Sequence, residues 1–218
     1  MDGTLRRHAD DRRTRSYRAR NNGSFDRAEA HRYTKAVHNS GEQVVLVADD
    51  GSVIGVADKA TVHTDQTPLH LAFSCHVRDD RGRILVTRRA LTKSTWPGVW
   101  TNSFCGHPAP NEAIDEAIVR RAAHELGTRI RDVTLALPDF RYRAVDASGV
   151  VEFEICPVYT AIIDADLRPE PSEVVEWNWV DPERLLDGVT ATPWAFSPWL
   201  TLQFPQLMND GHRASPQR

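Results

Sequence analysis

The stretch that decides the fold is Gly106–Gly127, which reads GHPAPNEAIDEAIVRRAAHELG. Its apolar residues recur at 114, 118, 119, 122 and 126, the spacing of one face of an α-helix. Prolines and Asn111 punctuate the beginning of the stretch, and Gly127 is typical of a helix C-terminus. The sequence therefore predicts a helix over 112–126.

Short apolar runs on both sides of this helix predict β-strands. The runs 44–48 and 53–56 flank Asp49-Asp50-Gly51-Ser52, a turn sequence, so we expect a hairpin near the beginning of the folded part. Further strands are expected over 69–77, 83–88, 133–137, 140–145, 150–163 and 176–180. The strand over 83–88 is expected to pair with the strand over 69–77. Further helices are expected over 182–187 and 197–207. Hairpins with helices packed on a sheet indicate an α+β (mixed α/β) class.

Composition narrows the class of protein. The chain has 218 residues, of which 40% are hydrophobic and 26% charged, as in one folded domain of ordinary size. A net charge of -3 argues against nucleic acid as a partner. No apolar run approaches the ~20 residues of a membrane helix or resembles a secretory signal. Three cysteines, an odd number, do not form a disulfide framework, so we expect a cytoplasmic protein. Nothing in the sequence indicates a large interface, so we expect a monomer, and we expect no membrane partner.

The two ends differ from the middle. Residues 1–40 are rich in arginine and poor in aliphatic side chains, which predicts a polar, disordered extension. Basic residues there could form a nucleic-acid arm, but interspersed aspartates weaken that interpretation. We expect a catalytic domain over 41–207 and a polar tail over 208–218.

Glu152 and Glu154 alternate along an expected strand, so both carboxylates point to the same face. Two like charges on a buried face require a compensating cation or proton. Together with His63, His70 and His107 they would suit a divalent ion. The alternative is a solvated pair on an edge strand, with each histidine an ordinary surface or core residue.

Cys105 allows three interpretations. It is a small buried hydrophobic residue, a zinc ligand together with His107, or a general acid or nucleophile whose thiol is tuned by its neighbours. Gly106 would let the backbone bring the thiol close to a ligand. Cys75 and Cys156 lie in expected strands and are interpreted as core residues.

Several basic residues near these segments could bind phosphate groups, although solvated surface charge is the usual role of any one of them. They are Lys59, Arg89, Lys93 and Arg121.

The helix resembles a Nudix box, with the pattern G-x5-E-x7-R at Gly106, Glu112 and Arg120. Of the three glutamates that the box expects after this arginine, only Glu125 is present. Arg121 and His124 replace the other two. The scaffold is therefore kept, while the carboxylate cluster that holds hydrolytic metals in Nudix hydrolases is mostly lost.

Over about 44–202 the chain resembles type 1 isopentenyl-diphosphate Δ-isomerases. The runs that carry the resemblance are Leu69–Ser74, Val86–Ala90, Trp96–Pro108, Pro138–Ala144, Val151–Pro157 and Thr192–Trp199. The resemblance implies a Nudix-like fold, a mixed sheet between helices, here with an added N-terminal β-hairpin. It also implies interconversion of isopentenyl and dimethylallyl diphosphate by alkene protonation and opposite-face deprotonation.

The resemblance further implies a role for each site residue. The catalytic residues would be Cys105, Glu154 and Tyr142. The tight metal site, for Mn²⁺, Zn²⁺ or Mg²⁺, would be His63, His70, His107, Glu152 and Glu154. A Mg²⁺ ion would join the diphosphate to Glu125 and to the backbone of Cys105. Substrate would be bound by Lys59, Arg89, Lys93, Arg121 and Trp199.

Two other functions compete with this one. A Nudix-type hydrolase would need the missing glutamates. A zinc-stabilised interaction domain would use Cys105 and His107 as structural ligands, but the cysteine-rich sets typical of such sites are absent from the sequence.

Overall fold

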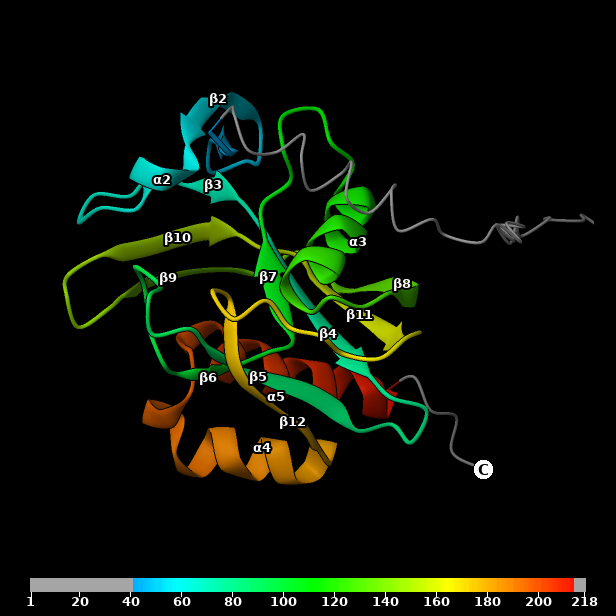
Figure 1. Cartoon of the computed structure of the whole chain (residues 1–218). Helices are drawn as coiled ribbons and strands as arrows, with labels where there is room; N and C mark the ends of the chain where they lie inside the picture. The colour runs from blue at the N-terminus through cyan, green and yellow to red at the C-terminus, as the bar shows by residue number, and fades with distance from the viewer. Residues whose placement is uncertain (1–40, 214–218) are drawn as a thin grey trace, which may run out of the picture. The chain divides into compact units, whose positions relative to one another are not determined.

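The computed structural model describes residues 41–213 (Figure 1), so the expected extension over 1–40 lies outside the described residues. The strands are β1 (Gln43–Val47), β2 (Val53–Asp58), β3 (His70–Leu71), β4 (Phe73–Arg78), β5 (Ile84–Arg89), β6 (Trp100–Thr101), β7 (Phe104–Gly106), β8 (Ile130–Leu137), β9 (Arg141–Val145), β10 (Val151–Ile155), β11 (Val158–Ile163) and β12 (Val174–Val180). The helices are α2 (Lys59–Val62), α3 (Ile114–Glu125), α4 (Pro182–Ala191), the 3-10 helix η1 (Pro193–Ala195) and α5 (Pro198–Arg213). None of the helices in this part of the chain is long and apolar enough to cross a membrane.

The strands form two mixed sheets. One has five strands in the order β2-β1-β3-β10-β9, and its edge is the expected hairpin of β1 and β2. The other has seven strands: β12-β5-β4-β11-β8, with β6 beside β5 and β7 beside β4. The expected pairing of 69–77 with 83–88 is limited to Arg78 and Ile84, because β6, β7 and β12 occupy the remaining positions beside these strands.

Two chain segments pass together from one sheet into the other. The segment expected as one strand over 69–77 is divided at Ala72 into β3 and β4, and 150–163 is divided at Cys156-Pro157 into β10 and β11. Backbone bonds from Ala72 to Ile155 (2.9 Å) and from Ser74 to Pro157 (3.1 Å) join the segments at the crossing. Pro157 has no N–H to donate, which favours a break in the ladder at this point.

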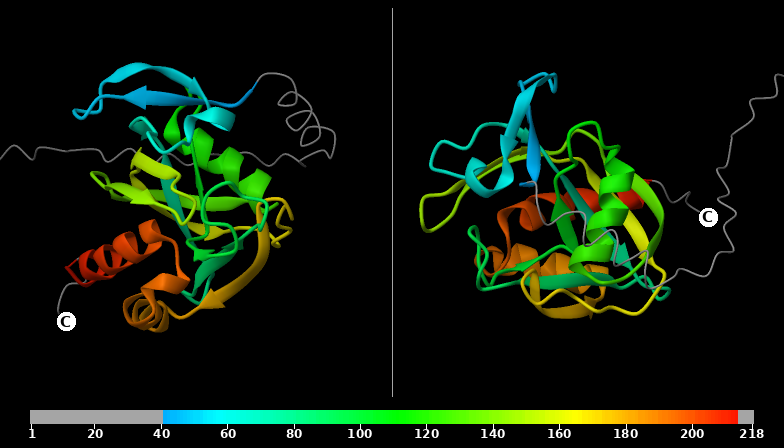
Figure 2. Two further views of the ribbon diagram at one scale, coloured as in Figure 1. Left: turned by 90° about the vertical axis from the view of Figure 1, so that its left-hand side faces the viewer. Right: turned by 45° about the horizontal axis from the view of Figure 1, so that its top comes forward.

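The seven-stranded sheet is covered on both faces. Phe73, Cys75 and Val77 of β4 pack with Ile118 and Ala122 of α3. On the opposite face, alternate residues of β5 pack with apolar side chains of α4 and α5. Figures 1 and 2 show α3 on one side of this sheet and α4 and α5 on the other, which agrees with the sheet between helices that the family resemblance implied. The prediction of Cys75 and Cys156 as core residues is confirmed, since both are buried.

The helix boundaries differ in detail from those expected. α3 begins at Ile114 rather than 112, because Ala113 is extended and offers no capping side chain. α4 extends to Ala191, and the Asp181 side chain caps its N-terminus by accepting from the Glu183 and Arg184 amides. α5 continues to Arg213, within the range expected as a polar tail.

Candidate active site and metal centre

The crossing of the two sheets brings the candidate site residues together. Glu154 of β10 lies opposite His70 in the parallel pairing with β3, and opposite Tyr142 in the antiparallel pairing with β9. His63 directly follows α2, and a bond from the Val151 amide to the Thr64 carbonyl (2.8 Å) holds its segment against β10. His107 directly follows β7.

Three imidazoles surround one carboxylate. The Nε2 atoms of His70 and His107 lie 3.5 Å and 3.2 Å from Oε1 of Glu154. The ring centroids of the histidines are 5.1 to 5.9 Å apart. One ligand atom from each of His63, His70, His107 and Glu154 can be chosen so that all lie within 4.8 Å of one another.

The donor set fits a divalent metal ion. Nδ1 of His70 faces the Pro68 carbonyl (2.9 Å), which leaves Nε2 to face the cluster. Nε2 of His63 and of His70 are both buried and form no hydrogen bond, although a glutamate oxygen lies 3.3 Å from the first and 3.5 Å from the second. A cation bound among these atoms would compensate for the missing hydrogen bonds. Burial lowers the pKa of His107 to about 4 despite its contact with Glu154, so this imidazole is neutral, as a ligand must be.

Glu152 lies two positions before Glu154 on β10, and it is not part of the group of ligand atoms that lie within 4.8 Å of one another. Its Oε2 lies 3.3 Å from Nε2 of His63, and its Oε1 accepts from the hydroxyl of Thr95 at 2.7 Å. The exposed fractions of Glu152 and Glu154 are 7% and 4%. The prediction that both face one buried site is confirmed, and the alternative of a solvated edge pair is wrong.

Cys105 lies in β7 beside the metal cluster. Its sulfur is 3.2 Å from Oγ of Ser74, and its S–H faces Oδ1 of Asn102 at 3.4 Å. Burial raises the pKa of the thiol to about 12, so Cys105 is protonated at neutral pH. Among the described residues, the metal-capable group does not include Cys105, which speaks against a Cys105–His107 zinc pair.

Gly106 is required for space rather than for backbone freedom, which corrects the expectation from sequence. A Cβ at this position would lie 2.8 Å from Cγ of Arg121 and 2.8 Å from the ring of Phe73. Its absence lets the Arg121 side chain pass directly beside the strand that carries Cys105.

Tyr142 and Trp199 form an aromatic wall of the site. Their ring centroids are 5.8 Å apart, and Trp96 meets Trp199 edge-on at 5.5 Å. Burial, and then the neighbouring carboxylate of Glu154, hold the pKa of Tyr142 well above its usual value, so its hydroxyl keeps its proton. The guanidinium of Arg89 lies 5.3 Å from the centre of the Trp199 ring.

Asn102 connects the thiol to this wall, and sequence reasoning missed it. Its Oδ1 accepts from Nε1 of Trp199 (2.9 Å), from the hydroxyl of Thr101 (2.9 Å) and from the Cys105 thiol. Its Nδ2 donates to the carbonyls of Cys75 and Phe104, so the amide is fully used although completely buried. Only its place within the run that carries the family resemblance could have drawn attention to it.

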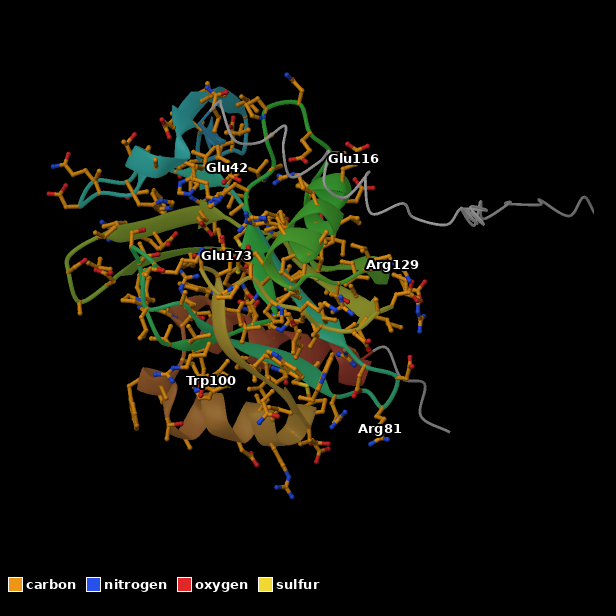
Figure 3. The ribbon with its side chains drawn as sticks, in the orientation of Figure 1. Glu42, Arg81, Trp100, Glu116, Arg129 and Glu173 are labelled. Atoms are coloured by element: carbon orange, nitrogen blue, oxygen red, sulfur yellow. The ribbon has the colours of Figure 1, made fainter. Side chains whose placement is uncertain are left out.

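Three of the four predicted phosphate-binding cations meet around two glutamates that sequence reasoning also missed. Glu42 lies 2.5 Å from Nζ of Lys59 and 3.8 Å from Arg121. Glu173 pairs with Lys93 and lies 3.5 Å from Arg121. Figure 3 labels both carboxylates, Glu42 near the β1–β2 hairpin and Glu173 at the start of β12.

Arg89 and Glu125 have other partners. Arg89 donates to the carbonyls of Thr95 and Trp96, away from the two glutamates. Glu125, the predicted ligand of the second ion, forms a buried ion pair with Arg121 one turn earlier on α3.

The Nudix-box positions retain their structural role. Arg120 binds Glu112 at 2.7 Å and donates to the carbonyl of His107 (3.2 Å), which fastens α3 to the segment that carries this histidine. Arg121 and His124, the two residues that replace carboxylates, both approach Glu173. The box therefore supports the site without forming an acidic metal cluster of its own.

Comparison with known proteins agrees with this geometry. A family model described as the NUDIX domain matches residues 68–200. Among solved structures, one from Deinococcus radiodurans superposes with a TM-score of 0.60 at 20% identity, covering 76% of this chain and 99% of that chain. A MutT protein from Methanosarcina mazei Go1 reaches 0.52 at 19% identity, covering 66% of this chain and 96% of that chain. At these identities the similarity shows the fold alone.

Some proteins of known sequence share a much higher identity with this chain than these solved structures do. An isopentenyl-diphosphate Delta-isomerase from Leifsonia xyli subsp. xyli is 70% identical over 168 residues, which cover 76% of this chain and 91% of the relative. The protein of the same name from Clavibacter michiganensis subsp. michiganensis is 66% identical over 76% of this chain and 86% of the relative. The resemblance inferred from the sequence is confirmed: the chain belongs to the isopentenyl-diphosphate Δ-isomerase family, built on the NUDIX fold.

Proposed function

We propose that this chain interconverts isopentenyl and dimethylallyl diphosphate, adding a proton to one face of the alkene and removing another from the opposite face. The observation that carries the proposal is the convergence of a protonated thiol, Cys105, and an ionised carboxylate, Glu154, in one buried site. Burial by itself raises the pKa of Glu154, but His107 and His70 hold it well below its usual value. The site thus contains a proton donor and a proton acceptor at the same pH, as acid–base catalysis requires.

The aromatic wall suits the intermediate of this reaction. An alkene is a very weak base, and protonating it gives a tertiary carbocation that water would capture. Trp199 is only 2% exposed, so its ring can stabilise positive charge by cation–π attraction while excluding water. Tyr142 lies beside Trp199 and opposite Glu154, where its hydroxyl can stabilise or relay a proton.

A divalent ion would be held by His63, His70, His107, Glu152 and Glu154, and we propose Mn²⁺, Zn²⁺ or Mg²⁺. When bound, the ion would compensate the two carboxylates and set the basicity of Glu154. The buried Nε2 atoms of His63 and His70 support this assignment, because they face glutamate oxygens without forming a hydrogen bond. The five side chains would bind the ion, and Glu154 would accept the proton.

The diphosphate would be bound by Lys59, Lys93, Arg121 and Arg89, which would hold the alkene in register with the thiol. It would arrive with Mg²⁺, for which Glu125 and the Cys105 backbone are the proposed protein ligands. The partners proposed are these small isoprenoid diphosphates, acted on by a cytoplasmic monomer that binds neither nucleic acid nor membrane.

The test is proton NMR of isopentenyl diphosphate in D₂O with the full chain and Mg²⁺, compared with the Glu154→Gln variant. Appearance of deuterated dimethylallyl diphosphate with the unaltered chain alone supports the proposal. Release of inorganic phosphate or of a monophosphate would favour the hydrolase. No conversion by a protein with metal bound would overturn the catalytic argument.

A further inference from the structure

Glu173 sits where three segments of the chain meet. Its carboxylate contacts Lys93 from the loop after β5, and Arg121 and His124 from α3 at 3.5 and 3.7 Å. Its side chain is 13% exposed. Although burial by itself raises the pKa of Glu173, His124, Arg121 and Lys93 hold it far below the usual value. The carboxylate is therefore a stable negative charge among the cations of the proposed diphosphate site.

Backbone hydrogen bonds hold the segment that carries Glu173 in place. The Arg168 and Glu170 amides donate to the carbonyls of Leu126 and Glu125 at the end of α3, and the Ala90 amide donates to the Glu173 carbonyl. Gly127 makes this docking possible, because it has a φ of +57° and a Cβ there would lie 2.1 Å from the Arg168 carbonyl oxygen. The last glycine of the Nudix-type motif thus serves to seat the segment that carries Glu173.

Glu42 is a second carboxylate that contacts Arg121 and one of the lysines. It contacts Lys59 and Arg121, and these two cations keep its pKa below the usual value although burial opposes the shift. Counting Glu125, three carboxylates face the three cations Lys59, Lys93 and Arg121, so the formal charges of these six groups cancel. Arg89, the fourth proposed diphosphate-binding cation, donates to backbone carbonyls instead, so the four cations exceed the three carboxylates by one charge. A site that binds a free polyanion would carry a larger surplus of positive charge.

We propose that Glu173, assisted by Glu42, makes this site selective for the metal complex of a diphosphate over the free anion. A bare diphosphate would bring several negative charges into a site with only one positive charge in excess, whereas one divalent cation cancels two of those negative charges. The inference rests on the proposed function, since it takes Lys59, Lys93, Arg121 and Arg89 to be the diphosphate-binding groups. It assigns the two glutamates a part in specificity that the proton transfer does not need.

The test is calorimetric titration of the full chain, with its histidine-site metal retained, using inorganic pyrophosphate with and without added Mg²⁺. We expect Glu173→Gln to bind metal-free pyrophosphate about threefold to tenfold more tightly than the unaltered chain, and so to narrow the advantage of the Mg²⁺ complex. Glu112→Gln is the matched control. It removes a carboxylate from the start of the α3 region, but its partner is Arg120 rather than any of the three cations.

The outcomes separate the inference from the function on which it rests. Weaker binding of both forms by Glu173→Gln, or an equal gain in Glu112→Gln, would overturn the selectivity inference while leaving the diphosphate site intact. If Lys93→Met binds pyrophosphate as tightly as the unaltered chain, the proposed diphosphate site itself is wrong. Should Glu173→Gln fail to fold, Glu42→Gln replaces it, with the same gain expected and an unchanged preference for Mg²⁺ again contradicting the inference.

Discussion

His70 and Glu154 occupy matched positions of the parallel pair β3 and β10, with Nε2 of the histidine 3.5 Å from Oε1 of the carboxylate. β3 has only two residues, and the chain leaves this sheet for the other immediately after it. One short strand pairing therefore joins a proposed metal ligand to the residue proposed to accept the proton. The geometry of the metal centre and that of the catalytic base are set together.

Replacing Cys105 tests whether its thiol is needed for turnover rather than for folding. We expect Cys105→Ser to lower kcat by about 10²- to 10⁴-fold, because it removes the proposed proton donor while nearly preserving its volume. Cys75→Ala is the control, since that buried sulfur packs in the core and should change the melting temperature more than kcat. Turnover and thermal unfolding measured on both variants decide the matter. A fully active Cys105→Ser variant would contradict the thiol role.

Metal content should depend on the histidine cluster. We expect elemental analysis to find about one tightly held divalent ion per chain, lost in His70→Asn and retained in His124→Asn, whose ring lies on the exposed side of α3. Chelation should abolish turnover before it unfolds the protein. Unfolding that accompanies metal loss without an earlier loss of activity would instead favour a structural zinc domain.

The aromatic face of Trp199 can be tested with two substitutions. Trp199→Phe keeps an aromatic ring but loses the N–H that donates to Asn102, whereas Trp199→Leu keeps only apolar volume. We expect kcat to fall further for Trp199→Leu, by about 2- to 30-fold relative to Trp199→Phe, if the face stabilises a carbocation. The dissociation constant of inorganic pyrophosphate should stay the same in both. Equal kcat values for the two variants would argue against cation–π stabilisation.

The buried His76 should lower the free energy of unfolding of this protein in mild acid. Its ring is buried in β4, where Nε2 lies 3.2 Å from Oε1 of Gln203, and burial lowers its pKa to about 4. The unfolded chain binds a proton at this residue below about pH 6.5, whereas the folded chain does not until about pH 4. The free energy of unfolding should therefore fall as the pH drops through this window, by up to about 1.4 kcal/mol per pH unit from this group alone.

Urea unfolding of the unaltered chain and of His76→Gln, measured between pH 4 and 7.5, isolates this contribution from that of the other histidines. We expect a steeper decline for the unaltered chain. Parallel pH profiles for the two proteins would show that His76 does not contribute as inferred.

Local pattern was enough for much of the fold and for placing the two glutamates of β10 on one buried face. Helical spacing located α3 to within two residues at its start, and turn residues located the β1–β2 hairpin. The alternation of Glu152 and Glu154 predicted one buried face for both. These features depend on neighbours in sequence, whose geometry the backbone period determines.

Contacts between distant segments were beyond such reasoning. Glu173 lies 80 positions from Lys93, and Asn102 lies 97 from Trp199, so neither pairing leaves a periodic signal. The division of 69–77 and 150–163 between two sheets also has no local cause strong enough to predict, apart from Pro157. The sequence by itself determined the family, the helix and the residue types of the site. Only the tertiary structure decided which charges meet and what they neutralise, because those contacts arise where separate segments pack together.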